Sequence, residues 1–224
     1  MDSNNIQKDG LAEKKDWIKK LEELTGKPLE LSEQKQNTGD EELNLYKDYH
    51  QPGYVYILLD TSGSMYTQEK ISRAKSGAIS FIEKAFKRNF KTGIIDFSLK
   101  AEVVVKPSTD LKELESRVKK IKASGPTNLT SALKLAREEF ENLNGKKVTY
   151  VITDGKPHDK NTSLKIAKRL KEERVHIMTL GTDDADQEFL EQLSSGEDLN
   201  RMTSRKELEA EISSMASLLP VDNE

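Results

Sequence analysis

Oxygen-bearing side chains gather in three short segments of the chain, each beside an apolar run or a glycine turn. Two of them are aspartates and three are hydroxyl residues. Mg2+ prefers an octahedron of oxygen ligands and is usually held by one or two carboxylates, with water in the remaining positions. The pattern therefore predicts a site for a hard divalent cation, magnesium first, with manganese or calcium as alternatives. The five candidate ligands are Asp60, Ser62, Ser64, Thr127 and Asp154.

The charges of this ligand set leave room for a ligand from outside. Asp60 and Asp154 together neutralise at most the two charges of the ion, because the hydroxyl ligands are neutral. A coordination position can therefore stay open, and an acidic side chain of another protein would fill it. The chain has no Cys and only three His, which argues against zinc or another soft-metal site.

Apolar runs that alternate with helical patterns predict the elements that position these residues. The alternation favours βαβ units and a largely parallel sheet. Too few residues separate the second and third runs for a helical crossover, so we expect an antiparallel hairpin there. Asp60 and Asp154 each follow a run, and ligands of open α/β sheets bind outside the carboxyl ends of the strands. The predicted strands are 54–59, 92–97, 102–106, 147–152, 175–180 and a short one near 199–202.

Helices are predicted where apolar residues recur with the 3.6-residue period. Three such stretches cover 71–86, 129–140 and 208–219. Basic residues at 117–122 and 165–171 are interleaved with apolar residues at the same spacing, which is typical of the solvated face of a helix.

The order of the candidate ligands resembles the von Willebrand factor type A family and its metal-ion-dependent adhesion site (MIDAS). The family pattern is Asp-x-Ser-x-Ser after the first strand, Thr in a later loop and Asp after the fourth strand, and all five positions are filled here. The resemblance covers about residues 52–220. It implies a doubly wound, three-layer α/β fold of the Rossmann-like kind, mainly parallel, with one antiparallel edge strand. One departure is Pro126, where many relatives have Gly, and it should stiffen the loop that carries Thr127.

The same resemblance implies a protein-binding module rather than an enzyme. A Glu or Asp side chain of the partner would complete the coordination of the metal ion. Intracellular relatives commonly act as adaptors beside AAA+ ATPases of the MoxR or chelatase type, and we expect such a role here. In related domains, a change in metal coordination is coupled to movement of the last helix, which corresponds to residues 205–219.

Two other functions stay open from the sequence. The domain could be a structural or self-assembling scaffold that the metal stabilises, or a hydrolase with a single metal ion. Several absences argue against a hydrolase. Ser62 stands where haloacid-dehalogenase-like enzymes carry a second Asp, and the chain has neither a Gly-x-Ser-x-Gly elbow nor a Gly-x-x-x-x-Gly-Lys phosphate loop.

The chain is predicted to have three parts: an acidic N-terminal extension over 1–50, a von Willebrand A domain over 51–220 and a tail over 221–224. The extension holds eight Lys against twelve Asp and Glu, a net charge of −4, whereas the remainder holds 28 Lys and Arg against 27 acidic residues. An amphipathic helix is expected over about 6–25, where Trp17 marks the face that packs on the domain or on a partner. A net-negative chain without an aromatic-rich basic stripe does not favour nucleic-acid binding.

No apolar stretch approaches the ~18 residues that a membrane span needs. The first residues also lack a basic region followed by an apolar one. We therefore expect neither a membrane span nor export, and a cytoplasmic location. The absence of Cys excludes disulfides and thiol catalysis.

Overall fold

The computed structural model describes residues 51–66, 69–155, 157 and 159–220. The predicted amphipathic helix and its polar linker lie outside the described residues, as does the tail. The division of the chain into three parts therefore stays a prediction, and the fold described below is that of the von Willebrand A region alone.

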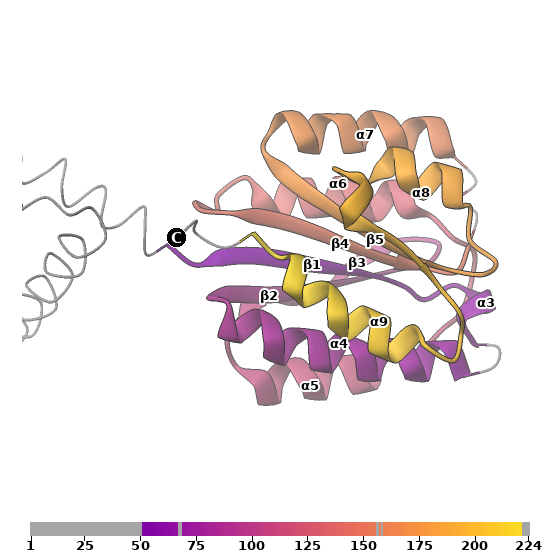
Figure 1. Ribbon diagram of the computed structural model, residues 1–224, viewed down its shortest axis with the longest axis horizontal. Helices are drawn as coiled ribbons and strands as arrows, with labels where there is room; N and C mark the ends of the chain where they lie inside the picture. Colours follow the sequence, from indigo (N-terminus) through magenta and orange to yellow (C-terminus); the bar gives the residue numbers. More distant parts are fainter. Residues whose placement is uncertain (1–50, 67–68, 156, 158, 221–224) are drawn as a thin grey trace, which may run out of the picture. The chain divides into compact units, whose positions relative to one another are not determined.

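Six strands form one mixed sheet in the order β3-β2-β1-β4-β5-β6 (Figure 1). All neighbouring pairs are parallel except β2 and β3, which run antiparallel. The predicted doubly wound sheet and its hairpin are confirmed, and the antiparallel strand lies at one edge. The strands are β1 Gly53–Asp60, β2 Phe90–Phe97, β3 Ala101–Ser108, β4 Lys147–Thr153, β5 Val175–Thr182 and β6 Asn200–Thr203.

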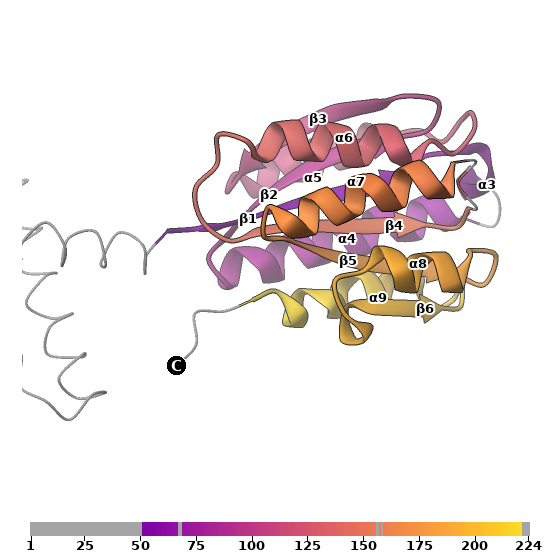
Figure 2. The same cartoon turned by 90° about the horizontal axis from the view of Figure 1, so that it is seen from above.

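Helices cover both faces of the sheet and complete the three layers (Figures 1 and 2). The helices α6, α7 and α8 pack on one face, and α4, α5 and α9 pack on the other. None of the helices in the described part of the chain is long and apolar enough to cross a membrane. The helices are α3 Gly63–Tyr66, α4 Lys70–Lys87, α5 Leu111–Lys120, α6 Leu129–Phe140, α7 Lys160–Glu172, α8 Gln187–Leu193 and α9 Leu208–Ser214, with 3-10 turns η2 Glu197–Leu199 and η3 Met215–Leu218.

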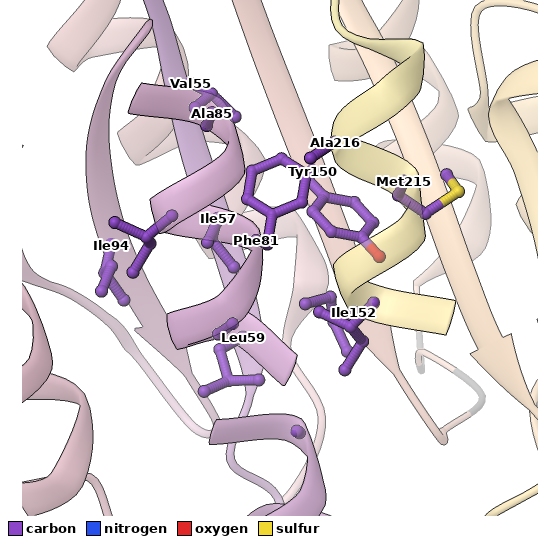
Figure 3. Close-up of a cluster of buried hydrophobic side chains, with 14 of the residues drawn as sticks. Val55, Ile57, Leu59, Phe81, Ala85, Ile94, Tyr150, Ile152, Met215 and Ala216 are labelled. Carbon is purple, nitrogen blue, oxygen red and sulfur yellow. The ribbon is translucent and has the colours of Figure 1, made fainter. Parts of the chain in front are cut away.

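The central strand β1 is buried on both faces and contributes to two hydrophobic cores. Val55 and Ile57 pack into the core beneath α4 and α9 (Figure 3). Tyr56 and Leu58 alternate with them and enter the core beneath α6, α7 and α8. A strand that is covered on both faces must be apolar at nearly every position, which explains the uninterrupted apolar run in this part of the sequence.

The periodic residues of the predicted helices are buried, although two element boundaries differ from the prediction. The last predicted helix divides into α9 and the turn η3, and Leu208, Ile212, Met215 and Leu219 all contact the core. Two short helices, α3 and α8, were not predicted. They have four and seven residues, too few for an apolar period to stand out.

The strand order reverses at β1, which lies between β2 and β4. The chain leaves β1 toward α4 on one face of the sheet and leaves β4 toward α7 on the other. Leu59 pairs with Ile152, so the residues that follow both strands reach the same edge of the sheet. Asp60 and Asp154 thus lie at the point where α/β sheets bind ligands.

The contact between α4 and α9 is close at Gly77, where a Cβ atom would lie 2.8 Å from Ile212 Cβ and 2.9 Å from the Glu209 carbonyl oxygen. We expect Gly77→Val to lower the free energy of unfolding by about 1–3 kcal/mol, because overpacking would push the helices apart. Gly196→Val is the control, since nothing lies within 4 Å of a Cβ there, and its effect should stay within about 0.5 kcal/mol. Urea unfolding measures both, and equal losses would contradict the packing argument.

Candidate metal centre

Asp60 is the last residue of β1, and its side chain is buried. Its Oδ1 accepts a hydrogen bond from the Ser62 backbone N–H at 2.8 Å, and its Oδ2 accepts one from Thr153 Oγ1 at 2.5 Å. Burial raises the pKa of Asp60 to about 6, with a smaller upward contribution from Asp154, although the hydrogen bonds from Thr153 and Ser62 lower it. Among the described residues, Asp60 forms no ion pair with a basic side chain.

The two serines link Asp60 to Asp154 across the start of α3. Ser62 is buried and Ser64 is exposed, and their Oγ atoms lie 3.0 Å apart. Ser64 Oγ donates a hydrogen bond to Asp154 Oδ1 at 2.7 Å. The turn after β1 therefore brings both hydroxyls to the carboxylate that follows β4.

Thr127 reaches the same place on a separate loop between α5 and α6. The Gly63 N–H donates to the Gly125 carbonyl at 2.8 Å, which ties this loop to the start of α3. A Cβ atom on Gly155 would lie 2.9 Å from Thr127 Oγ1 and 3.5 Å from Asp60 Oδ2. Only glycine leaves enough space there, so the Thr127 hydroxyl and the Asp60 carboxylate border the same small volume.

Thr127 is not the N-cap of the helix that follows, although a threonine at this point of the sequence could have been one. The cap of α6 is Asn128, whose side chain accepts a hydrogen bond from the Ser131 N–H at 3.1 Å. Gly125, with φ of 86°, supplies the left-handed turn that comes before Pro126. The loop therefore presents the Thr127 hydroxyl to the site and leaves the capping to its neighbour.

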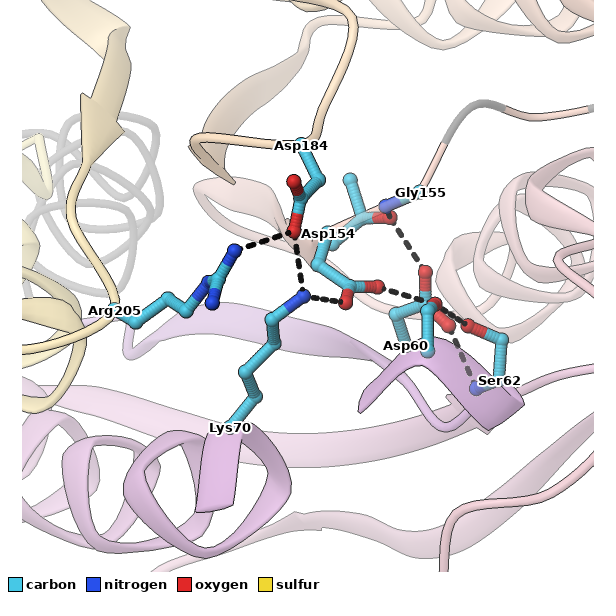
Figure 4. A network of polar contacts seen from close by, with 9 residues as sticks. Asp60, Ser62, Lys70, Asp154, Gly155, Asp184 and Arg205 are labelled. Carbon is cyan, nitrogen blue, oxygen red and sulfur yellow. Dashed lines mark hydrogen bonds and ion pairs between the residues drawn. The ribbon is translucent and has the colours of Figure 1, made fainter. Parts of the chain in front are cut away.

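Asp154 differs from Asp60 because it has a basic partner. Its side chain is buried, and its Oδ2 lies 2.5 Å from Lys70 Nζ at the start of α4. Lys70 Nζ also lies 2.9 Å from Asp184 Oδ2, on the loop after β5 (Figure 4). The Lys70 ammonium lowers the pKa of Asp184.

Lys70, Thr153 and Asp184 were not predicted from the sequence as parts of the site. The helical period contained a signal for Lys70, because Ala74, three to four residues on, is buried and Lys70 lies on the same face of α4. A lysine at that position must be paired if it is buried. No comparable signal marks Asp184, which lies on a loop far along the chain.

The five predicted ligands thus converge on one crevice between the ends of β1 and β4 and the loop that carries Thr127. Two buried carboxylates and three hydroxyls form the oxygen-rich set that a hard cation prefers. Within the described residues, no group of three His, Cys, Asp or Glu is placed to hold a metal ion. A cation here would depend on the hydroxyls as well as on the two carboxylates.

Comparison with known families agrees with this geometry. The model of the von Willebrand factor type A domain matches residues 55–217, well over half of the chain. The chain belongs to this family. Domains of the family are mostly interaction and adhesion modules, and its metal sites bind divalent ions. A comparison with curated proteins gives no match.

Several solved structures share the von Willebrand A fold at low sequence identity. The type V pili tip protein Mfa5 from Porphyromonas gingivalis has a domain that is 11% identical, with a TM-score of 0.70, over 78% of this chain and 98% of that one. Proximal thread matrix protein 1 from the mussel byssus, with a zinc-occupied MIDAS motif, is 17% identical with a TM-score of 0.68. BatB from Bacteroides thetaiotaomicron is 20% identical with a TM-score of 0.60, over 74% of this chain and 99% of that one.

This chain covers 76% of its own length but only 46% of the byssus protein in that comparison. At identities this low, the likeness shows the fold alone. The von Willebrand A sheet is therefore shared with proteins of the pilus and the byssus, whereas the ligands and partners of those proteins say nothing directly about this one.

The raised pKa of Asp60 predicts how the stability of the protein without added metal depends on pH. The folded protein holds this proton more tightly than the unfolded chain, because the pKa rises from 3.8 to about 6 on folding. The stabilisation is therefore complete below about pH 4 and is lost as the pH rises through 6. In EDTA, wild type should lose about 2–3 kcal/mol relative to Asp60→Asn between pH 4 and 7. Urea unfolding at each pH measures this, and parallel pH profiles would contradict it.

Proposed function

We propose that this chain is a metal-dependent protein-binding module that recognises an acidic side chain of its partner. Asp60, Ser62, Ser64, Thr127 and Asp154 would hold the divalent cation, and a Glu or Asp of the partner would complete its coordination. The observation that supports this most strongly is the meeting of all five side chains at the crevice between β1 and β4.

Magnesium is the ion that we propose, with manganese or calcium as alternatives. Carboxylate and hydroxyl oxygens suit hard cations, and the set contains no sulfur or imidazole ligand. When bound, the ion would supply a positive charge with an exchangeable coordination position. The zinc seen in the byssus protein is a property of that protein, so comparing several ions is part of the test.

The chain's own residues prepare the site for such an ion. Thr153 and the Ser62 N–H orient the Asp60 carboxylate, and Ser64 orients one oxygen of Asp154. Gly155 leaves the space between Thr127 and Asp60 free of side-chain atoms. Ser64 is exposed, so the site opens to solvent on the side where a partner would approach.

The surface around the site also supports protein binding. Tyr66 at the end of α3 and Leu99 in the β2–β3 turn are 75% and 63% exposed, and both lie on segments that border the crevice. A pocket beside Thr127 is lined partly by Leu99 and Pro126, with Lys134 on its wall. Apolar groups beside a cation site suit a partner segment in which the acidic residue has apolar neighbours.

We also propose that the partner is an intracellular complex, such as an AAA+ ATPase of the MoxR or chelatase type, and that the protein acts in the cytoplasm. This part rests on the resemblance to intracellular members of the family. The pilus and byssus neighbours belong to other settings, so the cellular location needs its own measurement.

A pair of threonines tests which hydroxyl belongs to the metal site. Thr127→Ala should weaken Mg2+ and Mn2+ binding at least about tenfold, because it removes an oxygen ligand. Thr130→Ala should leave binding unchanged, since Thr130 Oγ1 pairs with Ser163 Oγ at 2.7 Å on α6. Titration calorimetry measures both variants. Equal affinities in the two variants would place the ion elsewhere.

Capture of partners tests the function itself. We expect a protein to be retained from a lysate of the source organism by wild type with Mg2+ and by Thr130→Ala, but not by wild type with EDTA or by Asp60→Ala. Mass spectrometry identifies what is retained. The same set of proteins in every lane would contradict a metal-dependent interaction and direct attention to the N-terminal extension.

The two other functions predict different results from the same samples. A scaffold that uses the metal only for stability would lose much of its free energy of unfolding in EDTA and retain no partner in any lane. A hydrolase would show phosphatase or esterase activity that Asp60→Ala abolishes. We expect neither result, because Lys70 and Ser64 already supply Asp154 with partners from within the chain.

A further inference from the structure

We propose that Lys70 is a specificity-determining cation built into the site. It weakens the binding of the metal ion by itself and strengthens the binding of an acidic partner once the ion is present. This inference rests on the proposed function, because it concerns the charge of the same metal centre.

Lys70 is buried and has two carboxylate partners. Its side chain is 3% exposed, and its ammonium group lies 2.5 Å from Asp154 Oδ2 and 2.9 Å from Asp184 Oδ2. A buried ammonium that lost its partners would be costly, so these contacts hold the charge in place. Lys70 thus brings a positive charge into direct contact with a predicted metal ligand.

Asp184 does not cancel that charge by itself. Its side chain is 52% exposed, and it is shared with Arg205, whose guanidinium lies 3.4 Å from Asp184 Oδ2 (Figure 4). Two cations therefore compete for one carboxylate that water also screens. The charge of Lys70 acts mainly on Asp154, which is buried and faces the site.

The charge balance gives Lys70 opposite effects on the two binding steps. Asp60, Asp154 and Lys70 together carry −1, a divalent ion changes this to +1, and a partner carboxylate then brings it to zero. Without Lys70 the corresponding charges are −2, zero and −1. Lys70 therefore opposes the ion and favours the carboxylate, and by linkage a bound carboxylate must raise the affinity for the ion to the same extent.

A site with this balance would stay weakly occupied until an acidic partner arrives. The ion and the partner would then bind cooperatively, which would make recognition depend on the partner's carboxylate more than on the apolar contacts around it. The partner class that follows is a protein segment with an accessible Glu or Asp, and a neutral amide at that position would be rejected.

The first test replaces the charge of Lys70 and keeps a hydrogen-bond donor. Lys70→Gln should bind Mn2+ at least about tenfold more tightly than wild type in titration calorimetry at neutral pH. Lys87→Gln is the matched control, since it removes a charge from the same helix about 25 Å away and should leave the affinity unchanged. Acetate, compared with chloride at equal ionic strength, should raise the Mn2+ affinity of wild type more than that of Lys70→Gln.

A second pair of variants keeps the proposal testable if Lys70→Gln does not fold. Asp184→Asn removes one counter-charge from Lys70 and should weaken Mn2+ binding. Asp183→Asn removes a carboxylate from the same exposed loop, and it should weaken binding less because no contact joins Asp183 to Lys70. Equal effects of these two changes would contradict the role of Lys70.

The possible outcomes separate this inference from the proposed function. If wild type binds Mn2+ and Lys70→Gln binds it no more tightly, the inference is wrong and the metal site stands. If neither wild type nor any variant binds Mn2+, the metal-dependent function itself is wrong. Tighter Mn2+ binding in Lys70→Gln together with a smaller acetate effect supports the proposal.

Discussion

Two buried carboxylates at one edge of the sheet are the constraint on which the rest of the site depends. Asp60 and Asp154 follow neighbouring parallel strands and lose nearly all contact with water. A buried carboxylate must be hydrogen-bonded, paired or bound to a metal ion. Asp154 has a lysine, whereas Asp60 has hydrogen bonds from Thr153 and Ser62 and keeps a raised pKa. The remaining demand for positive charge is what a divalent cation would meet.

The fold meets this constraint with loops that are held by backbone contacts. The Thr61 N–H and hydroxyl both donate to the Phe97 carbonyl, and the Ser124 N–H donates to the Thr61 carbonyl. These bonds join the ends of β1 and β2 to the loop that carries Thr127. Hydroxyl ligands from three separate segments can therefore stay in place around the carboxylates, as binding sites require when they are organised before the ligand arrives.

Much of the fold and most of the site could be predicted from the sequence, because both depend on local patterns. The run from Tyr54 to Leu59 shows a doubly covered strand, and the ligand motif follows it directly. Lys70 and Asp184 could not be recognised in the same way, since they meet only after β1, β4 and β5 have assembled. The short helices α3 and α8 were missed because a few residues cannot show a period. The N-terminal extension with Trp17 lies outside the described residues, and its role stays a prediction.

Diffraction from crystals grown with Mn2+ would locate the ion without reference to any partner. Anomalous scattering of manganese should give one strong peak in the crevice, within coordination distance of oxygens from the Asp60, Ser62 and Thr127 segments and close to Asp154. Such a peak, absent from crystals of Asp60→Ala, is the result that we predict. A peak bound elsewhere on the protein, or no peak in crystals saturated with Mn2+, would contradict a metal-dependent function for this domain.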